Sequence, residues 1–485
     1  MSARLALLLS FVFVLAGCAT VPTVAGSGWS EVTSAHFQVL TNLDASDAQT
    51  AAVELERYRA ALLARWKHPE LPGAKAKMVI YADPSEFRER GARGYLGFFR
   101  DGRGPPILVE SRGTFTQEGL GLAKPSAHEL AHEINASILM RQPRWLAEGL
   151  ATYQSTVTVA DGKAVFGRGQ VNDLQMAHVY KPLTVAELFG WDALDLSTLS
   201  EEQLDRHYVW SWAWVTYLEN ERRPQFDDFL SRLARAEEPR QAFTAAFGTL
   251  DDAKTSTAVR EMLTRILPTE EIPMPQVPTA VTTRPLTPAE FHAMEATVWQ
   301  APIGTWTSEQ AEQFARGELA QALASDPKNA EALALAAQIG PEADRVARAR
   351  ELTQVEPGDG GAWLLLADAL GNGLEAQDER GQAFGQALAH AGDDPYVLTR
   401  VAAHVLNGNP KLAFDLSTRA VAKAPFDAGS VQLLAFAEVA TGRCDAAKRD
   451  AARALDLLPE RTAKASRDEI ATQLGKFTAA CEPAS

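Results

Sequence analysis

The chain has 485 residues, of which 46% are hydrophobic and 22% are charged. This length exceeds one ordinary domain and this composition excludes wholesale disorder, so we expect two or three folded units with buried cores. The formal net charge of -15 repels polyanions, which excludes non-specific binding to nucleic acid or to anionic lipid head groups. We therefore expect protein, peptide or small-molecule partners.

Residues 1–18, MSARLALLLSFVFVLAGC, are typical of an export signal, because Arg4 precedes an apolar run that is too short to span a bilayer comfortably. The ending Leu-Ala-Gly-Cys resembles the lipobox of bacterial lipoproteins, in which cleavage leaves a lipid-modified N-terminal cysteine. The resemblance implies a lipoprotein of the cell envelope whose only membrane anchor is the lipid on Cys18. Ala19 in place of Asp favours the outer membrane, facing the periplasm, although the inner membrane stays open. A plain secretory signal is the alternative.

The next segments predict a mixed α/β unit. Residues 19–28 are small and polar and should form a tether. Asp161-Gly162 separates two β-type runs and predicts a hairpin turn. DAQTAAVELERYRAALLARW has helical periodicity, and three apolar runs predict strands: HFQVLT, AKMVIYA and PPILVES. We expect this first domain to cover residues 29–267.

Residues 268–288 contain six prolines and no sustained helical period, so we expect an extended, proline-rich linker. Residues 289–485 are alanine-rich and helical. Prolines recur there at spacings near the roughly 34 residues of a tetratricopeptide unit, namely Pro327, Pro357, Pro395, Pro425 and Pro459. The segment AWLLLADAL also resembles the first helix of that pattern. These features predict tetratricopeptide-like helical repeats, with a generic alanine-rich bundle as the alternative.

Small residues recur in register with these prolines. Alanine lies twelve residues before four of them, at Ala315, Ala383, Ala413 and Ala447. It lies five residues before three of them, at Ala322, Ala420 and Ala454. Small side chains at these positions would let the two helices of a hairpin approach closely. Arg345 departs from the pattern, since it replaces the small residue expected before Pro357.

The segment HELAH carries the candidate metal ligands. His128 and His132 stand four residues apart, a spacing that places both imidazoles on one face of a helix. Hydrolytic zinc usually has three protein ligands and an open position for water. Glu148 follows a break at residues 141–143, and a second helix that starts at Pro143 would fold back toward the first. We therefore predict one zinc ion on His128, His132 and Glu148.

Glu129 has two interpretations at this stage. Ser126 is a good N-cap residue, and Glu129 stands three residues on, where a capping-box partner belongs. Glu129 also stands beside the liganding face, where a general base would take a proton from a zinc-activated water and pass it to the leaving amine. Both interpretations remain open.

HELAH followed by PRWLAEGLATY resembles the gluzincin metallopeptidases, in which the second helix supplies a glutamate ligand. It resembles more closely the exported bacterial peptidase-MA-like proteins, which often carry tetratricopeptide repeats. The similarity runs from about Trp29 to about Arg265, and only its metal motif is specific. It implies an α+β zincin-like metallopeptidase domain followed by an all-α tetratricopeptide-like repeat domain.

The resemblance also implies details of the site. Related enzymes stabilise the transition state with a downstream tyrosine or histidine, for which Tyr208 is the candidate and His207 the competitor; either could instead be a core residue. We expect Tyr153 to serve packing. The strand PPILVES resembles the edge strand that pairs with an extended peptide. The chain lacks the Gly-x-Met-Glu-Asn sequence of zinc aminopeptidases, which favours an endopeptidase.

Cys444 and Cys481 would meet an oxidising compartment after export, where they either pair as a disulfide or remain buried thiols. The leading interpretation of the whole chain is a lipid-anchored zinc endopeptidase whose repeats recruit a protein substrate or partner. A second is a non-catalytic zinc-containing scaffold that acts through its repeats. A third, resting on location alone, is a zinc hydrolase of cell-wall peptides.

Overall fold

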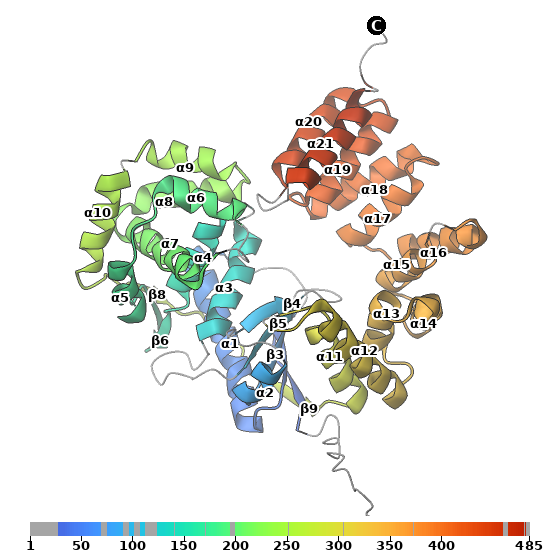
Figure 1. Cartoon of the computed structure of the whole chain (residues 1–485), viewed down its shortest axis with the longest axis horizontal. Helices are drawn as coiled ribbons and strands as arrows, with labels where there is room; N and C mark the ends of the chain where they lie inside the picture. Colours follow the sequence, from blue (N-terminus) through green and yellow to red (C-terminus); the bar gives the residue numbers. More distant parts are fainter. Residues whose placement is uncertain are drawn as a thin grey trace, which may run out of the picture.

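The computed structural model describes residues 28–68, 75–90, 97–100, 107–111, 124–139, 141–169, 171–194, 199–250, 252–303, 305–371, 373–458, 464–479 and 481. The predicted signal peptide, its lipidation site Cys18 and the tether up to residue 27 lie outside these ranges. Within them, an α+β N-terminal region precedes an all-helical C-terminal region (Figure 1). No helix among the described residues is both long and apolar enough to cross a membrane.

A six-stranded mixed sheet organises the first part of the chain, in the order β4-β5-β3-β2-β1-β9. Strands β2, β3 and β5 run parallel, and the other pairs are antiparallel. The strands are β1 (Ser30–Thr33), β2 (Phe37–Thr41), β3 (Ala76–Tyr81), β4 (Gly97–Arg100), β5 (Ile107–Ser111) and β9 (Thr282–Pro285). The three predicted strands are therefore confirmed as β2, β3 and β5.

Both faces of this sheet are covered. On one face Met78 and Leu108 pack with α1 (Ala45–Trp66) and α3 (Lys124–Ile138). On the other face Val79 and Tyr81 pack with Phe87 of α2 (Pro84–Glu89) and with Trp299 of α11 (Pro288–Trp299). Strands buried on both faces need continuous apolar runs, which explains the sequences MVIY and ILV.

The remaining N-terminal elements build a helical subdomain around α7 (Glu201–Glu221), whose Trp210, Trp212 and Trp214 are fully buried. A second sheet has the order β6-β7-β8, and its β6–β7 hairpin turns at Asp161-Gly162, as predicted. Both turn residues have positive φ, which Asp and Gly tolerate in such turns. The other bounds are α4 (Arg144–Gln154), β6 (Thr158–Ala160), β7 (Lys163–Phe166), α5 (Val171–Val179), α6 (Val185–Gly190), η1 (Trp191–Ala193), α8 (Arg223–Ala234), α9 (Pro239–Phe247), α10 (Asp252–Leu263) and β8 (Glu270–Pro273).

The proline-rich segment 268–288 is extended, as expected, but it does more than link. Its two strands join different sheets, since β8 pairs with β7 and β9 pairs with β1. Prolines at the strand ends, Pro273 and Pro285, are compatible with edge positions because an edge strand leaves some amide positions unpaired. The segment and α11 after it are therefore packed on the N-terminal region.

The C-terminal region is an array of consecutive helix pairs. Each pair packs along its length, and the predicted small residues, among them Ala315, Ala383 and Ala447, are buried. Described prolines follow second helices as expected, with Pro395 opening the next one. The helices after α11 are α12 (Ser308–Ser325), α13 (Ala330–Ile339), α14 (Glu342–Val355), α15 (Gly360–Ala369), η3 (Leu374–Ala376), α16 (Gln377–Ala389), α17 (Pro395–Val405), α18 (Pro410–Lys423), α19 (Ala428–Ala440), α20 (Cys444–Asp456) and α21 (Lys464–Ala479).

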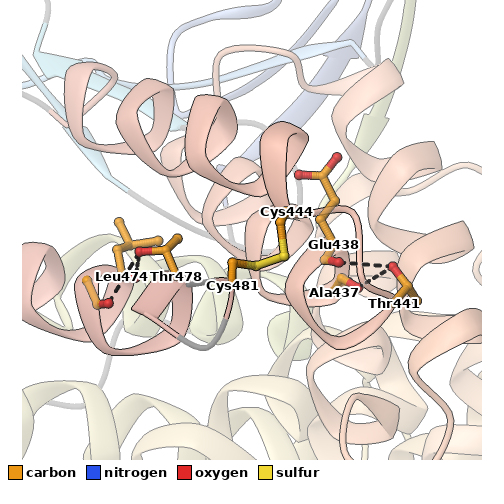
Figure 2. Close-up of a disulfide and its surroundings, with 8 residues drawn as sticks. Ala437, Glu438, Thr441, Cys444, Leu474, Thr478 and Cys481 are labelled. Atoms are coloured by element: carbon orange, nitrogen blue, oxygen red, sulfur yellow. Dashed lines mark hydrogen bonds between the residues drawn. A yellow bond between two sulfur atoms is a disulfide. The ribbon is translucent and has the colours of Figure 1, made fainter. Parts of the chain in front are cut away.

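The array ends in a covalent link. A disulfide joins Cys444, the first residue of α20, to Cys481, which follows α21 (Figure 2). The bond therefore fixes the final helix against the last pair.

Candidate metal centre

Helix α3 presents two imidazoles on one face. His128 Nε2 and His132 Nε2 lie 3.0 Å apart, and the two ring centroids are 4.7 Å apart. Each side chain keeps 21% of its surface exposed. The pair is thus accessible and has the i, i+4 geometry predicted from HELAH.

Helix α4 brings Glu148 to these histidines. Glu148 Oε2 lies 3.2 Å from His128 Nε2 and 3.3 Å from His132 Nε2. The three groups form a cluster in which the candidate ligand atoms all lie within 4.8 Å of one another. A tetrahedral zinc ion with bonds of about 2.0–2.1 Å needs ligand atoms roughly 3.3 Å apart. The two nitrogens and one oxygen therefore fit such an ion in both chemistry and spacing.

Two hydrogen bonds fix α4 against its neighbours, and a third joins α1 to α3. Trp66 Nε1 donates to Asn135 Oδ1, and Asn135 Nδ2 donates to Gln154 Oε1, both at 2.9 Å, which ties α1, α3 and α4 together. At the other end of α4, the backbone N–H of Arg144 donates to Asp192 at 2.8 Å. A carboxylate at a helix N-terminus satisfies a free amide and favours the helix dipole.

The position after the predicted ligand Glu148 must be glycine, because α4 lies very close to α7 at Gly149. A Cβ at this position would lie 2.5 Å from the carbonyl oxygen of Ser211 and 2.6 Å from Val215 Cγ2, both on α7. Only glycine lets α4 approach the backbone of α7 this closely. Trp145, fully buried among Phe189, Phe229 and Phe243, anchors the same helix.

The local electrostatics couple the three candidate ligands. Burial acts to raise the pKa of Glu148, but hydrogen bonds from His128 and His132 outweigh it and lower that pKa to about 2. Burial acts to lower the pKa of His132, and the Glu148 carboxylate outweighs it and raises that pKa. The cluster thus pairs a carboxylate whose acidity is increased with an imidazole whose affinity for a proton is increased. A metal dication would compete with protons for these groups.

Glu129 lines the same cleft as the three candidate ligands. Its pKa is raised by burial, with the two histidines acting in the opposite direction. The capping-box interpretation does not hold, because α3 begins at Lys124 and Ser126 lies inside its first turn. The Ser126 hydroxyl instead donates to Glu110 Oε2 on β5 at 2.5 Å. The prediction that Ser126 is an N-cap was wrong, because the local sequence does not reveal that its hydroxyl has a distant acceptor, Glu110 on β5.

The two candidates on α7 occupy different places. Tyr208 lines the cleft together with the candidate ligands and packs its ring against Trp191 at 5.3 Å. His207 is buried, and its Nδ1 lies 2.7 Å from the carbonyl oxygen of Gln203, with its ring beside Trp191. Of the two, the geometry places Tyr208 at the cleft. Tyr153 is buried and lies beneath the guanidinium of Arg65, which fits its predicted packing role.

The strand PPILVES is not an edge strand. Its residues Ile107–Ser111 form β5, which lies between β4 and β3, whereas β4 is the edge of the described sheet on this side and packs against α3. The prediction failed because the short run GFFR was too brief to be recognised as a strand from its sequence. Among the described strands, the edge on this side that could pair with an extended chain is therefore β4.

The cleft has a volume of about 780 Å³, and its lining includes residues that were not predicted from the sequence. Arg144 and Asp192 line it, and so do Leu457 and Leu458 from the C-terminal array. Arg144 stands inside PRWLAEG, where its charge in an apolar segment was the available signal. The other three carried no sequence signal.

Comparison with known families gives one match. Residues 123–239 match a family described as "Protein of unknown function (DUF1570)". This segment contains all the cleft residues except Leu457 and Leu458. No match was found among curated proteins.

Proposed function

We propose that this chain is a zinc-dependent metallopeptidase of gluzincin type, with one zinc ion held by His128, His132 and Glu148. The observation that carries the proposal is the cluster of two imidazole nitrogens and one carboxylate oxygen in an accessible cleft that also holds Glu129. This donor set is typical of catalytic zinc, which keeps an open position for water or substrate.

Bound zinc would supply polarisation of a peptide carbonyl and an acidic water. Glu129 is the general base in this scheme: its carboxylate accepts a proton from the attacking water and delivers it to the leaving amine. The contact between Ser126 and Glu110 supports this role, since it removes the capping explanation for Glu129.

Tyr208 is the proposed stabiliser of the oxyanion. Its place in the cleft lets a phenolic O–H donate to the oxygen of a tetrahedral carbon. His207, whose Nδ1 faces the Gln203 carbonyl oxygen, is the weaker candidate.

The substrate is proposed to be an extended peptide that pairs with the edge strand β4 by main-chain hydrogen bonds. This binding mode needs no free amino terminus, which fits an endopeptidase. The zincin-like and tetratricopeptide-like identities of the two regions, the lipid anchor on Cys18, an outer-membrane location and recruitment of protein by the array belong to the same proposal.

The test compares zinc content and casein hydrolysis in protein that begins after Cys18. We expect one zinc ion per chain in the wild type and in Glu129→Gln, with hydrolysis only in the wild type. Glu133→Gln is the matched control, because Glu133 follows His132 on the same helix but does not line the cleft. It should keep both zinc and activity.

Two other results would change the proposal. Zinc in both proteins without hydrolysis by either would favour the non-catalytic scaffold, in which the array performs the function. Absence of zinc from the wild type would overturn the metal site itself.

A further inference from the structure

Two parts of the chain that lie far apart in sequence build the cleft. Its other lining residues lie between His128 and Pro239, whereas Leu457 and Leu458 follow α20 near the C-terminus. In Figure 1 the helices after α11 form an arc that starts beside the sheet and returns with α20 and α21 toward α3. The end of the array therefore closes on the candidate metal centre.

An ion pair marks this contact. Arg141 Nη1 lies 2.5 Å from Asp456 Oδ2. Arg141 belongs to the connection between α3 and α4, the two helices that carry the candidate ligands. Asp456 is the last residue of α20, where the helix dipole disfavours a negative charge. The guanidinium of Arg141 neutralises the Asp456 carboxylate, which lies at the unfavourable end of the helix dipole. The ion pair therefore joins the end of α20 to the α3–α4 connection.

Apolar side chains also line the cleft, alongside polar ones such as Arg141 and Gln142. Ala136 follows His132 by four residues, which places it on the same side of α3, and Leu139 follows the end of that helix. Leu457 and Leu458 are only half-buried and line the same cleft from the array. An apolar side chain of a bound peptide would be buried from water between these groups, which is favourable. A polar side chain would find no hydrogen-bond partner on the two leucines.

We propose that Leu457 and Leu458 are specificity-determining residues. They form the wall of a subsite for a large apolar side chain of the peptide substrate, and the Arg141–Asp456 pair holds that wall in place. This inference rests on the proposed peptidase function for its selectivity, while the docking of the array is independent of it.

Docking is tested by hydrogen–deuterium exchange on the full chain without metal. Asp456→Arg should speed exchange of the amides of residues 141–146, because two like charges would then meet. The charge swap Arg141→Asp with Asp456→Arg should restore slow exchange. Asp368→Arg, which breaks the pair with Arg400 inside the array, is the matched control and should leave this segment unchanged.

Selectivity is tested by cleavage of a mixed peptide library with zinc-loaded protein. The wild type should cut beside large apolar residues. The double variant Leu457→Ala/Leu458→Ala should lose about tenfold or more in kcat/KM for those bonds relative to bonds beside small residues, with its zinc content unchanged. Leu412→Ala is the control, since Leu412 is a half-buried leucine of α18 that does not line the cleft.

The outcomes separate the two proposals. Unchanged exchange in Asp456→Arg overturns docking, and an unchanged cleavage profile in the double variant overturns the subsite. A wild type that binds no zinc or cuts no peptide overturns the proposed function and the selectivity together. The exchange experiment still decides the docking contact in that case.

Discussion

In the N-terminal region, the contacts that fix the candidate metal centre join elements far apart in sequence. Trp66 on α1 holds Asn135 on α3, and Gly149 on α4 packs against Ser211 on α7. In the helical array a local contact, the cap at a helix start, is repeated from one helix pair to the next. A side chain accepts from the first turn of the following helix at each of Asn329, Asp359, Asp394 and Asp427.

This difference bears on how each region tolerates change. A substitution at a long-range contact shifts two elements at once, so its effect should reach the candidate metal centre. A substitution at a repeated local contact disturbs one helix start and its neighbours, because each pair of a repeat array contacts mainly the adjacent pairs. Four predictions test this contrast.

The largest expected effect is the pH dependence of the free energy of unfolding that arises from Glu110, the buried partner of Ser126. Burial raises the pKa of Glu110 from its ordinary 4.5 to about 8, with the charge of Glu129 adding to the rise and the Ser126 hydrogen bond opposing it. A raised folded-state pKa means that the stabilisation is complete below about pH 4.5 and is lost as the pH rises through about 8. Roughly 4 kcal/mol should disappear between about pH 5 and pH 9.

Urea unfolding of metal-free protein at these two pH values measures this loss. Glu110→Gln keeps the size of the side chain and cannot ionise, so its pH dependence should be smaller by that amount. Equal pH dependence of stability in the wild type and in Glu110→Gln would show that the pKa of Glu110 does not differ between the folded and unfolded states.

The second effect belongs to the array. The disulfide closes a segment with a sequence separation of 37 residues, and its loss should cost about 2–4 kcal/mol. In the variant Cys444→Ser/Cys481→Ser, we expect faster hydrogen exchange in α20 and α21 and unchanged exchange in α3 and α7. Faster exchange in α7 would instead mean that the two regions unfold as one unit.

The third effect is overpacking beside a candidate ligand. Gly149→Ala should destabilise the N-terminal region by about 1–3 kcal/mol and weaken zinc binding, because a Cβ collides with the backbone of α7. The matched control is Gly317→Ala on α12, where a Cβ meets nothing within 4 Å. That control should stabilise the array by up to about 1 kcal/mol. Thermal unfolding and zinc titration distinguish the two variants.

The smallest effect is the loss of one helix cap. Asp427 accepts from the backbone N–H of Ser430 at 2.7 Å and from its hydroxyl at 2.6 Å. Asp427→Ala should cost about 1 kcal/mol without changing zinc content. Asp427→Asn retains an acceptor and should recover most of the loss in the same unfolding measurement. A change in zinc content would contradict the local character of the array.

The amino-acid sequence by itself determined the features that depend on neighbouring residues. Apolar runs gave β2, β3 and β5, and Asp161-Gly162 gave the β6–β7 turn, because side-chain alternation and positive φ act over a few residues. The i, i+4 spacing likewise placed His128 and His132 on one helical face. Recurring prolines and alanines marked the helix pairs of the array for the same reason.

Only the tertiary structure decided what depends on distant partners. It brought Glu148 to the histidines and paired the Ser126 hydroxyl with Glu110. It also made β4, and not β5, the edge of the described sheet. It also paired the proline-rich segment with both sheets and carried Leu457 into the cleft. Each of these contacts joins residues that share no local periodicity, so it becomes defined only when the elements pack.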